Sequence, residues 1–159
     1  MILMFLPKAI FSQTETFRPK YSTILKVKEK SNTLRMCSRI TPSEIESYYD
    51  LKKEDAQKLE KNMTGIYKLE AKKVYCGDNK IKDLASFGYQ YLGIVIKGKK
   101  YIYVNAFFLT KVKDSGLNFL KRNWKRKLVN VCDGAGGFWG VLYDVEEKKF
   151  SDLEFNDCG

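Results

Sequence analysis

Short stretches that alternate apolar and polar residues fill the second half of the chain and constrain its fold more than any other feature. They run from residue 89 to residue 156 and are separated by polar or glycine-rich turns. A period of two residues is typical of strands with one buried face. Parallel neighbours need a crossover of a dozen residues or more, and most of these turns are far shorter. The pattern therefore predicts an antiparallel sheet.

The first two of these strands form a predicted hairpin around Gly98, which accepts the positive φ that tight turns require. The loop length sets the register. A three-residue loop over residues 97–99 places Ile94 opposite Ile102, whereas a two-residue loop over residues 98–99 gives a different pairing. We favour the three-residue loop because it gathers the aliphatic side chains on one face.

The favoured register leaves a second face that is aromatic, with Tyr91, Tyr101, Tyr103 and Phe107. So many aromatic rings are unusual for a solvent surface, so either another element or a partner covers them. Tyrosine has a rigid apolar body and a polar tip, which suits a contact surface. We therefore expect Tyr91, Tyr101 and Tyr103 to bind a partner. A register that splits the three rings, or a helix that covers them, would remove this hypothesis.

Three further stretches predict an antiparallel meander at the C-terminal end. The strands are expected at residues 127–132, 138–145 and 150–156. An Asp-Gly-Ala-Gly-Gly turn at residues 133–137 joins the first two. This turn does not match a phosphate-binding loop, because a strand follows it where a helix N-terminus would be needed.

A helix is predicted before the strands, beginning at residues 41–44. The tetrapeptide Thr-Pro-Ser-Glu has the pattern of a capping box, with Pro at N1 where no amide hydrogen is needed. Apolar residues recur at helical spacing from Ile45 to Met63, which predicts a stripe packed on the sheet. Asp50 offers a second start and hence two helices, and Gly65 is the expected end.

Helices followed by strands indicate an α+β fold, with one or two N-terminal helices on an antiparallel sheet of about five strands. A chain of 159 residues is long enough to bury one core, so we expect a single domain at residues 39–159. Residues 13–38 are expected to be poorly structured.

The N-terminus bears on location. Residues 1–12 form a short apolar run before polar residues, as at the end of a secretory signal peptide cleaved after Ser12. A start placed too far downstream would explain why no basic segment precedes the run. The run is too short to span a bilayer, so we expect no transmembrane anchor. We predict a periplasmic or secreted protein, with a retained hydrophobic N-terminus as the alternative.

The four cysteines have neither the spacing of a zinc site nor that of a thioredoxin-like motif. In an exported chain they are expected to form disulfides. A meander brings the end of the last strand near residue 133, so we favour Cys132 with Cys158 and Cys37 with Cys76, while other pairings stay open. In a cytoplasmic chain all four would be reduced and would pack as small apolar residues.

Histidine is absent, which excludes Ser-His-Asp and Cys-His catalytic arrangements and mixed Cys/His zinc sites. Asp133 and Asp144 are conceivable as a carboxylate pair. Each also stands where a turn favours Asp for its side-chain bond to the backbone, and we prefer that interpretation. We expect no catalytic residue, no metal and no cofactor.

Part of the net charge of +10 lies in a basic segment that also carries aromatic residues. Its residues are Lys121, Arg122, Trp124, Lys125, Arg126 and Lys127. Such a mixture can bind single-stranded nucleic acid through phosphate neutralisation and stacking, although no nucleic-acid motif accompanies it. We favour a solvated connector held down by Trp124, which would also attract an anionic surface polymer.

Several of these stretches together resemble a known group of proteins. They are residues 89–93, residues 100–107, Trp124 with residues 129–134, and residues 138–141. They are similar to a group of small exported Bacteroidetes proteins without a known activity, over residues 41–156. The resemblance implies an envelope or secreted location and assigns no catalytic or binding residue.

Taken together, the sequence predicts an exported, non-enzymatic binding module. Its expected partner is a protein or an anionic surface polymer. The alternative is a cytoplasmic nucleic-acid-binding protein that uses the basic residues 121–127, and an enzyme is the third possibility.

Overall fold

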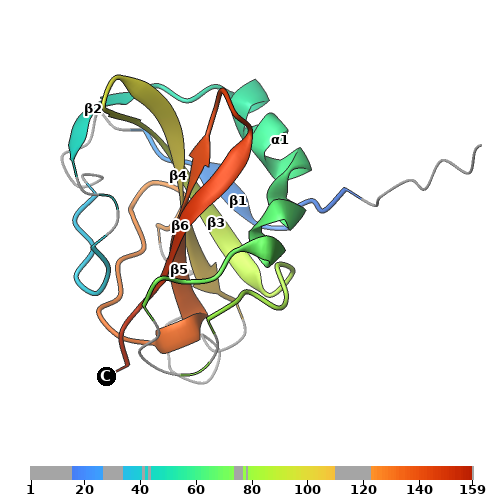
Figure 1. Cartoon of the computed structure of the whole chain (residues 1–159), viewed down its shortest axis with the longest axis vertical. Coiled ribbons are helices and arrows are strands. Elements are labelled where there is room, and N and C mark those ends of the chain that lie inside the picture. Colours follow the sequence, from blue (N-terminus) through green and yellow to red (C-terminus); the bar gives the residue numbers. More distant parts are fainter. Residues whose placement is uncertain are drawn as a thin grey trace, which may run out of the picture.

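The computed structural model describes residues 16–26, 34–40, 42, 44–73, 77, 79–109 and 123–158 (Figure 1). The expected signal segment, Cys76, Lys121 and Arg122 lie outside them. The described elements, in chain order, are β1 (Ser22–Ile24), β2 (Ile45–Tyr49), α1 (Lys53–Lys61), the 3₁₀ helix η2 (Met63–Lys68), β3 (Phe87–Ile96), β4 (Lys99–Phe108), the 3₁₀ helix η4 (Ala135–Gly137), β5 (Phe138–Asp144) and β6 (Lys149–Phe155).

The strands form one six-stranded sheet, which confirms the α+β class. Its order is β1-β3-β4-β5-β6, and β2 also pairs with β3. β1 runs parallel to β3, while the other pairs are antiparallel. The sheet is therefore mixed, and the prediction of a wholly antiparallel sheet is wrong. A parallel neighbour is possible for β1 because the chain between β1 and β3 is long enough to return to the same edge.

The β3–β4 hairpin exists, but its loop consists of Lys97 and Gly98, so neither predicted register is correct. Ile96 pairs with Lys99, and Ile94 pairs with Tyr101. Both loop residues have positive φ, 50° for Lys97 and 73° for Gly98. Positive φ at both central positions is the mark of a type I′ turn, whose twist matches that of the flanking strands. The twist of the sheet thus prevails over the cost of placing a lysine in the left-handed region.

This register divides the three tyrosines between the two faces of the sheet. Tyr91 lies opposite Val104, on one face, whereas Tyr101 and Tyr103 lie opposite Ile94 and Leu92, on the other. Neighbouring residues of a strand alternate between faces, so a shift of one position exchanges them. The three rings do not form one surface, and the predicted tyrosine contact surface is wrong.

The helix predicted from residue 41 is also wrong, because residues 45–49 form the edge strand β2. Tyr48 and Tyr49 pair with Ile94 and Gly93 of β3. Glu44 has a φ of 65°, which does not continue into a right-handed helix. β-branched and aromatic side chains favour a pleated surface, and here pairing with β3 prevails over the local capping pattern. Thr41 and Ser43 lie outside the described residues.

The α-helix begins later, at Lys53, so the second of the two predicted starts is nearer. Its N-cap, Lys52, makes no side-chain capping bond. The helix ends at Lys61, and its C-cap, Asn62, donates from Nδ2 to the Lys58 carbonyl at 2.9 Å. The chain then continues as η2 through Gly65, which is not the expected stop.

The C-terminal hairpin of β5 and β6 is confirmed, but the first strand of the predicted meander does not form. Residues 127–132 carry no strand, and residues 135–137 form η4 instead of a hairpin turn. β5 pairs with β4 in their place. Several peptide groups of this segment, such as the Lys127 carbonyl and both groups of Val129, bond to side chains instead, as described below.

The two faces of the sheet bury different side chains. One cluster joins Leu59 and Met63 of the helical segment to Tyr89 and Trp139 of the sheet. On the opposite face, a second cluster contains Leu34, Leu92, Tyr103 and Leu142, and a third contains Phe107, Trp124 and Val129. α1 and residues 34–40 accordingly lie on opposite sides of the sheet (Figure 1).

Replacement of Gly98 by Ala tests the turn. A Cβ at this position meets no atom within 4 Å, so only the backbone conformation is penalised. We expect Gly98→Ala to lower the free energy of unfolding by about 1–2 kcal/mol. Urea unfolding would measure the loss. Gly136→Ala is the matched control, because its Cβ also meets nothing and its φ is not positive, so it should stay within about 0.5 kcal/mol of wild type.

Candidate functional site

Residues 34–40, which we call the strap, cross the face of the sheet opposite α1. A disulfide joins Cys37 of the strap to Cys132, with the two Cα atoms 5.0 Å apart. Asn130 holds the same stretch, since its Oδ1 accepts the Cys37 amide hydrogen at 3.3 Å and its Nδ2 donates to the Arg35 carbonyl at 2.8 Å. The strap is thus fixed to the loop that follows β4 by one covalent bond and two hydrogen bonds.

This disulfide corrects the favoured pairings of Cys132 with Cys158 and of Cys37 with Cys76. Those pairings assumed that residues 127–132 form a strand beside the end of the last strand, and that strand does not exist. Cys158 is also disulfide-bonded. The prediction of disulfides in place of free thiols holds for Cys37, Cys132 and Cys158.

A buried polar pair lies at the centre of this face. Gln90 of β3 and Asn105 of β4 are opposite each other, and Asn105 Nδ2 donates to Gln90 Oε1 at 2.9 Å. Asn105 Nδ2 also donates to the Val129 carbonyl at 2.8 Å, while Gln90 Oε1 accepts the Val129 amide hydrogen at 2.8 Å. Gln90 Nε2 donates to the carbonyls of Trp124 and Lys127. Two side chains therefore bond to four backbone groups of this irregular segment.

The strap joins this network through Arg39. Its Nη2 donates to Asn105 Oδ1 at 2.6 Å. The guanidinium is buried, with 6 % of the residue exposed, and burial lowers its pKa. The Tyr103 hydroxyl is buried on the same face, and a Cβ at Gly140 would collide with it. Glycine at this position therefore leaves the space that the hydroxyl occupies.

A groove of about 310 Å³ lies beside the strap, over β4, β5 and β6. Its apolar residues come from the strap, the segment after it and the sheet, and its polar residues come mainly from β6. The lining residues are Ile40, Pro42, Glu44, Lys72, Ile96, Tyr101, Leu142, Ser151, Asp152 and Glu154. Ile40 is 67 % exposed, an unusual position for a large apolar side chain.

A β-bulge shapes the polar wall of this groove. Gly140 pairs with Glu154 and Leu142 pairs with Ser151, so two residues of β6 lie opposite one residue of β5. Within the bulge, Asp152 has a φ of 53°. Its carboxylate accepts hydrogen bonds from Lys72 and Ser151, and chiefly the Lys72 bond lowers its pKa. Bulges commonly redirect a side chain, and here the redirected side chain borders the groove.

The predicted contact tyrosines have different positions. Tyr91 is 1 % exposed and its hydroxyl donates to Glu60 Oε1 at 3.0 Å, and burial raises its pKa well above the usual value. Tyr103 is fully buried. Tyr101 alone of the three borders the groove. Two of the three nominated rings are thus unavailable to a partner.

The basic segment has exposed cations around a buried ring. Lys125, Arg126 and Lys127 are exposed, whereas Trp124 is 5 % exposed and packs edge-on against Phe107 with ring centroids 5.6 Å apart. This arrangement agrees with a solvated connector held by Trp124.

Asp144, one of the two carboxylates considered as a catalytic pair, accepts the amide hydrogens of residues 146 and 147, each at 2.9 Å, and so stabilises a turn.

Sequence reasoning missed Arg39, Gln90 and Asn105. Gln90 and Asn105 each interrupt an otherwise apolar or aromatic stretch of a strand. Once the true register is known, they fall opposite each other, and a buried polar pair is the natural inference. With the predicted register, they do not meet.

Comparison with protein-family models, with curated proteins and with solved structures finds no match. None of the helices in the described part of the chain is long and apolar enough to cross a membrane. Among the described residues, no group of three or more cysteine or carboxylate side chains is placed to hold a metal ion. The site is therefore interpreted from its own residues.

Replacement of Asn105 by Ala tests the polar network. The change removes three hydrogen bonds: it leaves Arg39 Nη2 and the Val129 carbonyl without this buried partner, and it leaves Gln90 Oε1 with the Val129 amide hydrogen alone. We expect a loss of about 3 kcal/mol in the free energy of unfolding, measured with urea. Asn62→Ala is the control, since its bonds to Lys58 and Tyr143 lie nearer the solvent and should cost about 1 kcal/mol or less. Equal losses in the two variants would contradict a central role for Asn105.

Proposed function

We propose that this protein is an exported, non-enzymatic binding module that receives an apolar side chain of a partner protein in the groove beside the strap. The observation that carries the proposal is the groove itself, with Ile40 exposed at its edge and Tyr101 and Leu142 among its lining residues. Binding sites usually combine apolar side chains with polar groups in a concave surface, and five of the ten residues that line this groove are apolar or aromatic. The groove replaces the predicted tyrosine contact surface as the proposed binding site.

The charges around the groove favour a protein over an anionic polymer as its ligand. Glu44, Asp152 and Glu154 line it, against two ammonium groups, one from Lys72 and one from Lys97, which pairs with Glu44. These carboxylates would repel a polyanion. An anionic surface polymer would instead meet the exposed residues Lys125, Arg126 and Lys127, away from these carboxylates.

Export is supported by the covalent chemistry of the strap. Cys37 and Cys132 are both exposed, and their disulfide would meet the reductants of its compartment directly. Disulfides persist outside the cytoplasm, in the periplasm or in secreted proteins, and are rare inside. The apolar run at residues 1–12 supports the same location.

A non-enzymatic role is supported by the state of the groove's carboxylates. Lys72 lowers the pKa of Asp152, which keeps this carboxylate ionised and makes it a weak base near neutral pH. Glu44 is paired with Lys97 at 3.0 Å. The chain contains no histidine, the commonest general base.

A nucleic-acid-binding role is the less favoured alternative. Base stacking needs an accessible aromatic face, and Trp124 is buried against Phe107. The exposed cations at 125–127 would then supply phosphate attraction without stacking, which gives weak and salt-sensitive binding.

A peptide selection tests the groove. Peptides selected from a random library against the intact protein should perturb the backbone amide signals of residues 96, 101, 142 and 151 in NMR spectra. Ile40→Ser should weaken these peptides at least about tenfold, because it removes an exposed apolar side chain from the groove edge. Tyr67→Ser is the control, since Tyr67 is the other large exposed apolar side chain of the described chain and lies outside the groove. Perturbations elsewhere, or equal loss in both variants, would refute the groove as the binding site.

The mass of the intact protein tests export. Protein recovered from a bacterial host and alkylated without reduction should lack residues 1–12 and carry no alkylated cysteine. An uncleaved chain with four alkylated thiols would overturn the exported location, and binding of the basic segment to RNA would then be measured as a function of salt. The mass measurement does not bear on whether the groove binds a peptide, so the two tests can fail separately.

A further inference from the structure

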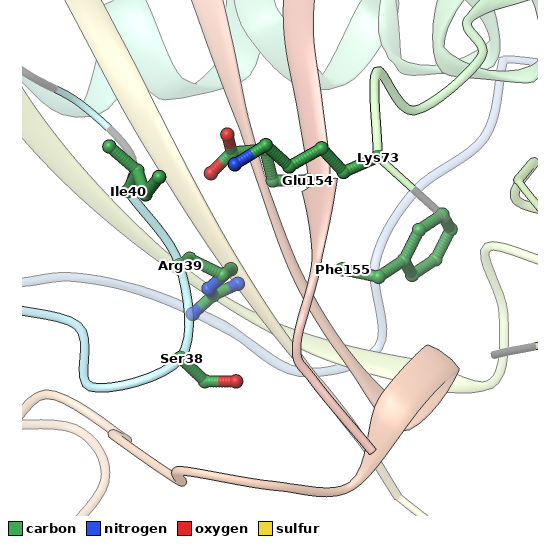
Figure 2. Close-up of a pocket in the computed structure, with 6 residues that line it drawn as sticks. All are labelled: Ser38, Arg39, Ile40, Lys73, Glu154 and Phe155. Atoms are coloured by element: carbon green, nitrogen blue, oxygen red, sulfur yellow. The ribbon is translucent and has the colours of Figure 1, made fainter. Parts of the chain in front are cut away.

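A further groove, which we call the edge groove, lies between the strand β1 and the helix α1, which are neighbours at one end of the sheet (Figure 1). Its volume is about 240 Å³. The residues that line it from the two elements are Ser22, Thr23 and Ile24 of β1 and Lys53, Ala56, Gln57 and Glu60 of α1. It shares no lining residue with the groove beside the strap, or with the small cavity around Arg39 that Figure 2 shows.

The backbone of β1 has hydrogen-bonding groups that point away from the sheet. The Tyr21 carbonyl accepts an amide hydrogen of β3 at 3.0 Å, and the Leu25 amide donates to a carbonyl of β3 at 3.0 Å. Because the peptide groups of a strand alternate in direction, the N–H and C=O groups of Ser22 and Ile24 point outward. β1 is the last strand of the sheet on this side, so no strand in the described part of the chain pairs with these groups. Such an edge is a template for one more strand.

The other edges of the sheet are less suited to pairing. β2 has a register shift between Ile45 and Ser47, and β6 has the bulge that contains Asp152. Bulges twist an edge away from a new neighbour. β1 keeps a regular register with β3 throughout. Since β1 has three residues, main-chain bonds alone would hold a partner weakly, and the adjacent edge groove supplies further contact area.

The edge groove is preformed, because hydrogen bonds tie its two walls together. The Tyr91 hydroxyl donates to Glu60 Oε1 of α1 at 3.0 Å, and the Ser22 side chain of β1 is hydrogen-bonded to the same hydroxyl. Lys53 and Glu60 give this lining one charge of each sign, so neither sign is favoured. Ile24 and Ala56 contribute apolar surface. A side chain that enters the edge groove is therefore expected to be apolar.

The other face of β1 is basic. Thr23 Oγ1 donates to the Lys125 carbonyl at 3.4 Å, which places the basic segment beside β1. Residues 16–26 and 123–131 together contain six lysine or arginine residues and no carboxylate. Successive side chains of a strand point to opposite faces, so every second side chain of a strand added to β1 would lie on this basic face. Carboxylates at those positions would complement its charge.

We propose that β1 binds an extended segment of a partner protein as an additional strand, in which apolar side chains alternate with carboxylates. The apolar side chains enter the edge groove, and the carboxylates lie on the basic face. Main-chain bonds to Ser22 and Ile24 hold the segment, and the alternate side chains select it, as in other cases of strand addition. This inference does not depend on the proposed function of the groove beside the strap.

Three short synthetic peptides serve as probes for the intact, disulfide-bonded protein. A peptide that alternates valine with glutamate should bind and slow hydrogen exchange at the Ser22 and Ile24 amides at least about tenfold. A peptide that alternates valine with lysine should bind at least about tenfold more weakly at low salt. The valine–glutamate peptide with methylated backbone nitrogens keeps its side chains but loses its main-chain donors, so it should also bind at least about tenfold more weakly.

Two substitutions of Ser22 give a matched pair of variants. Ser22→Pro removes the outward N–H, at an edge position where proline is tolerated, and should weaken the valine–glutamate peptide at least about tenfold. Ser22→Ala loses the same hydroxyl but keeps the N–H, so its affinity should stay within about threefold of wild type. Circular dichroism checks that both variants fold. If Ser22→Pro does not fold, the methylated peptide tests the same bonds in the wild-type protein.

Four outcomes would overturn the proposal. The first is that the valine–glutamate peptide does not bind, or binds without slowing exchange at Ser22 and Ile24. The second is equal loss of affinity in Ser22→Pro and Ser22→Ala, and the third is equal affinity for the glutamate and lysine peptides. The fourth is a dimer of the free protein that Ser22→Pro dissociates, since a second copy of the chain would then occupy the edge.

Discussion

The hydrogen bond between Gln90 and Asn105 is the interaction on which the face opposite α1 depends. These two side chains are opposite each other on neighbouring central strands and are almost fully buried. A buried amide without partners is costly, so this pair requires a polar layer above it. The backbone of residues 124–129 supplies that layer. Its amide and carbonyl groups bond to these two side chains instead of to the backbone of a neighbouring strand. This is why a stretch with a strand-like sequence remains irregular.

The same pair determines how the strap is held. Asn105 Oδ1 accepts from Arg39, so the strap is fixed over the sheet by a charge-assisted bond near one end and by the Cys37–Cys132 disulfide a short distance away. A disulfide acts mainly by restricting the unfolded chain, whereas the arginine bond acts in the folded state alone. The two therefore stabilise the strap by different means. Together they hold Ile40, which is 67 % exposed, at the edge of the groove, and this placement creates one side of the groove.

Much of the fold was predictable from the sequence, but the register and the first helix start were not. The alternation of residues 89–108 and 138–155 predicted four strands, because a half-buried antiparallel strand leaves a period-2 pattern. The loop at Lys97 was missed because a lysine with positive φ follows from the sheet twist and not from its own preference. The capping pattern at residue 41 gave a wrong helix prediction because it reflects local sequence alone, whereas β2 forms by pairing with β3. The predicted disulfide pairing was wrong because it assumed a strand at residues 127–132. That segment is irregular, and its backbone bonds to the side chains of Gln90 and Asn105.

The charges of the groove follow from its position on a chain with a net charge of +10. On such a chain a surface carboxylate has lysines near it, and Asp152 and Glu44 are paired with Lys72 and Lys97. Both lysine side chains are at least 75 % exposed, and exposed ion pairs of this kind contribute little to stability. An incoming cation can therefore replace either lysine at little cost, so the ion pairs can select a ligand without providing most of its affinity. Affinity for the proposed partner would then come mainly from the apolar lining residues, because removal of apolar surface from water is the larger and less salt-sensitive contribution.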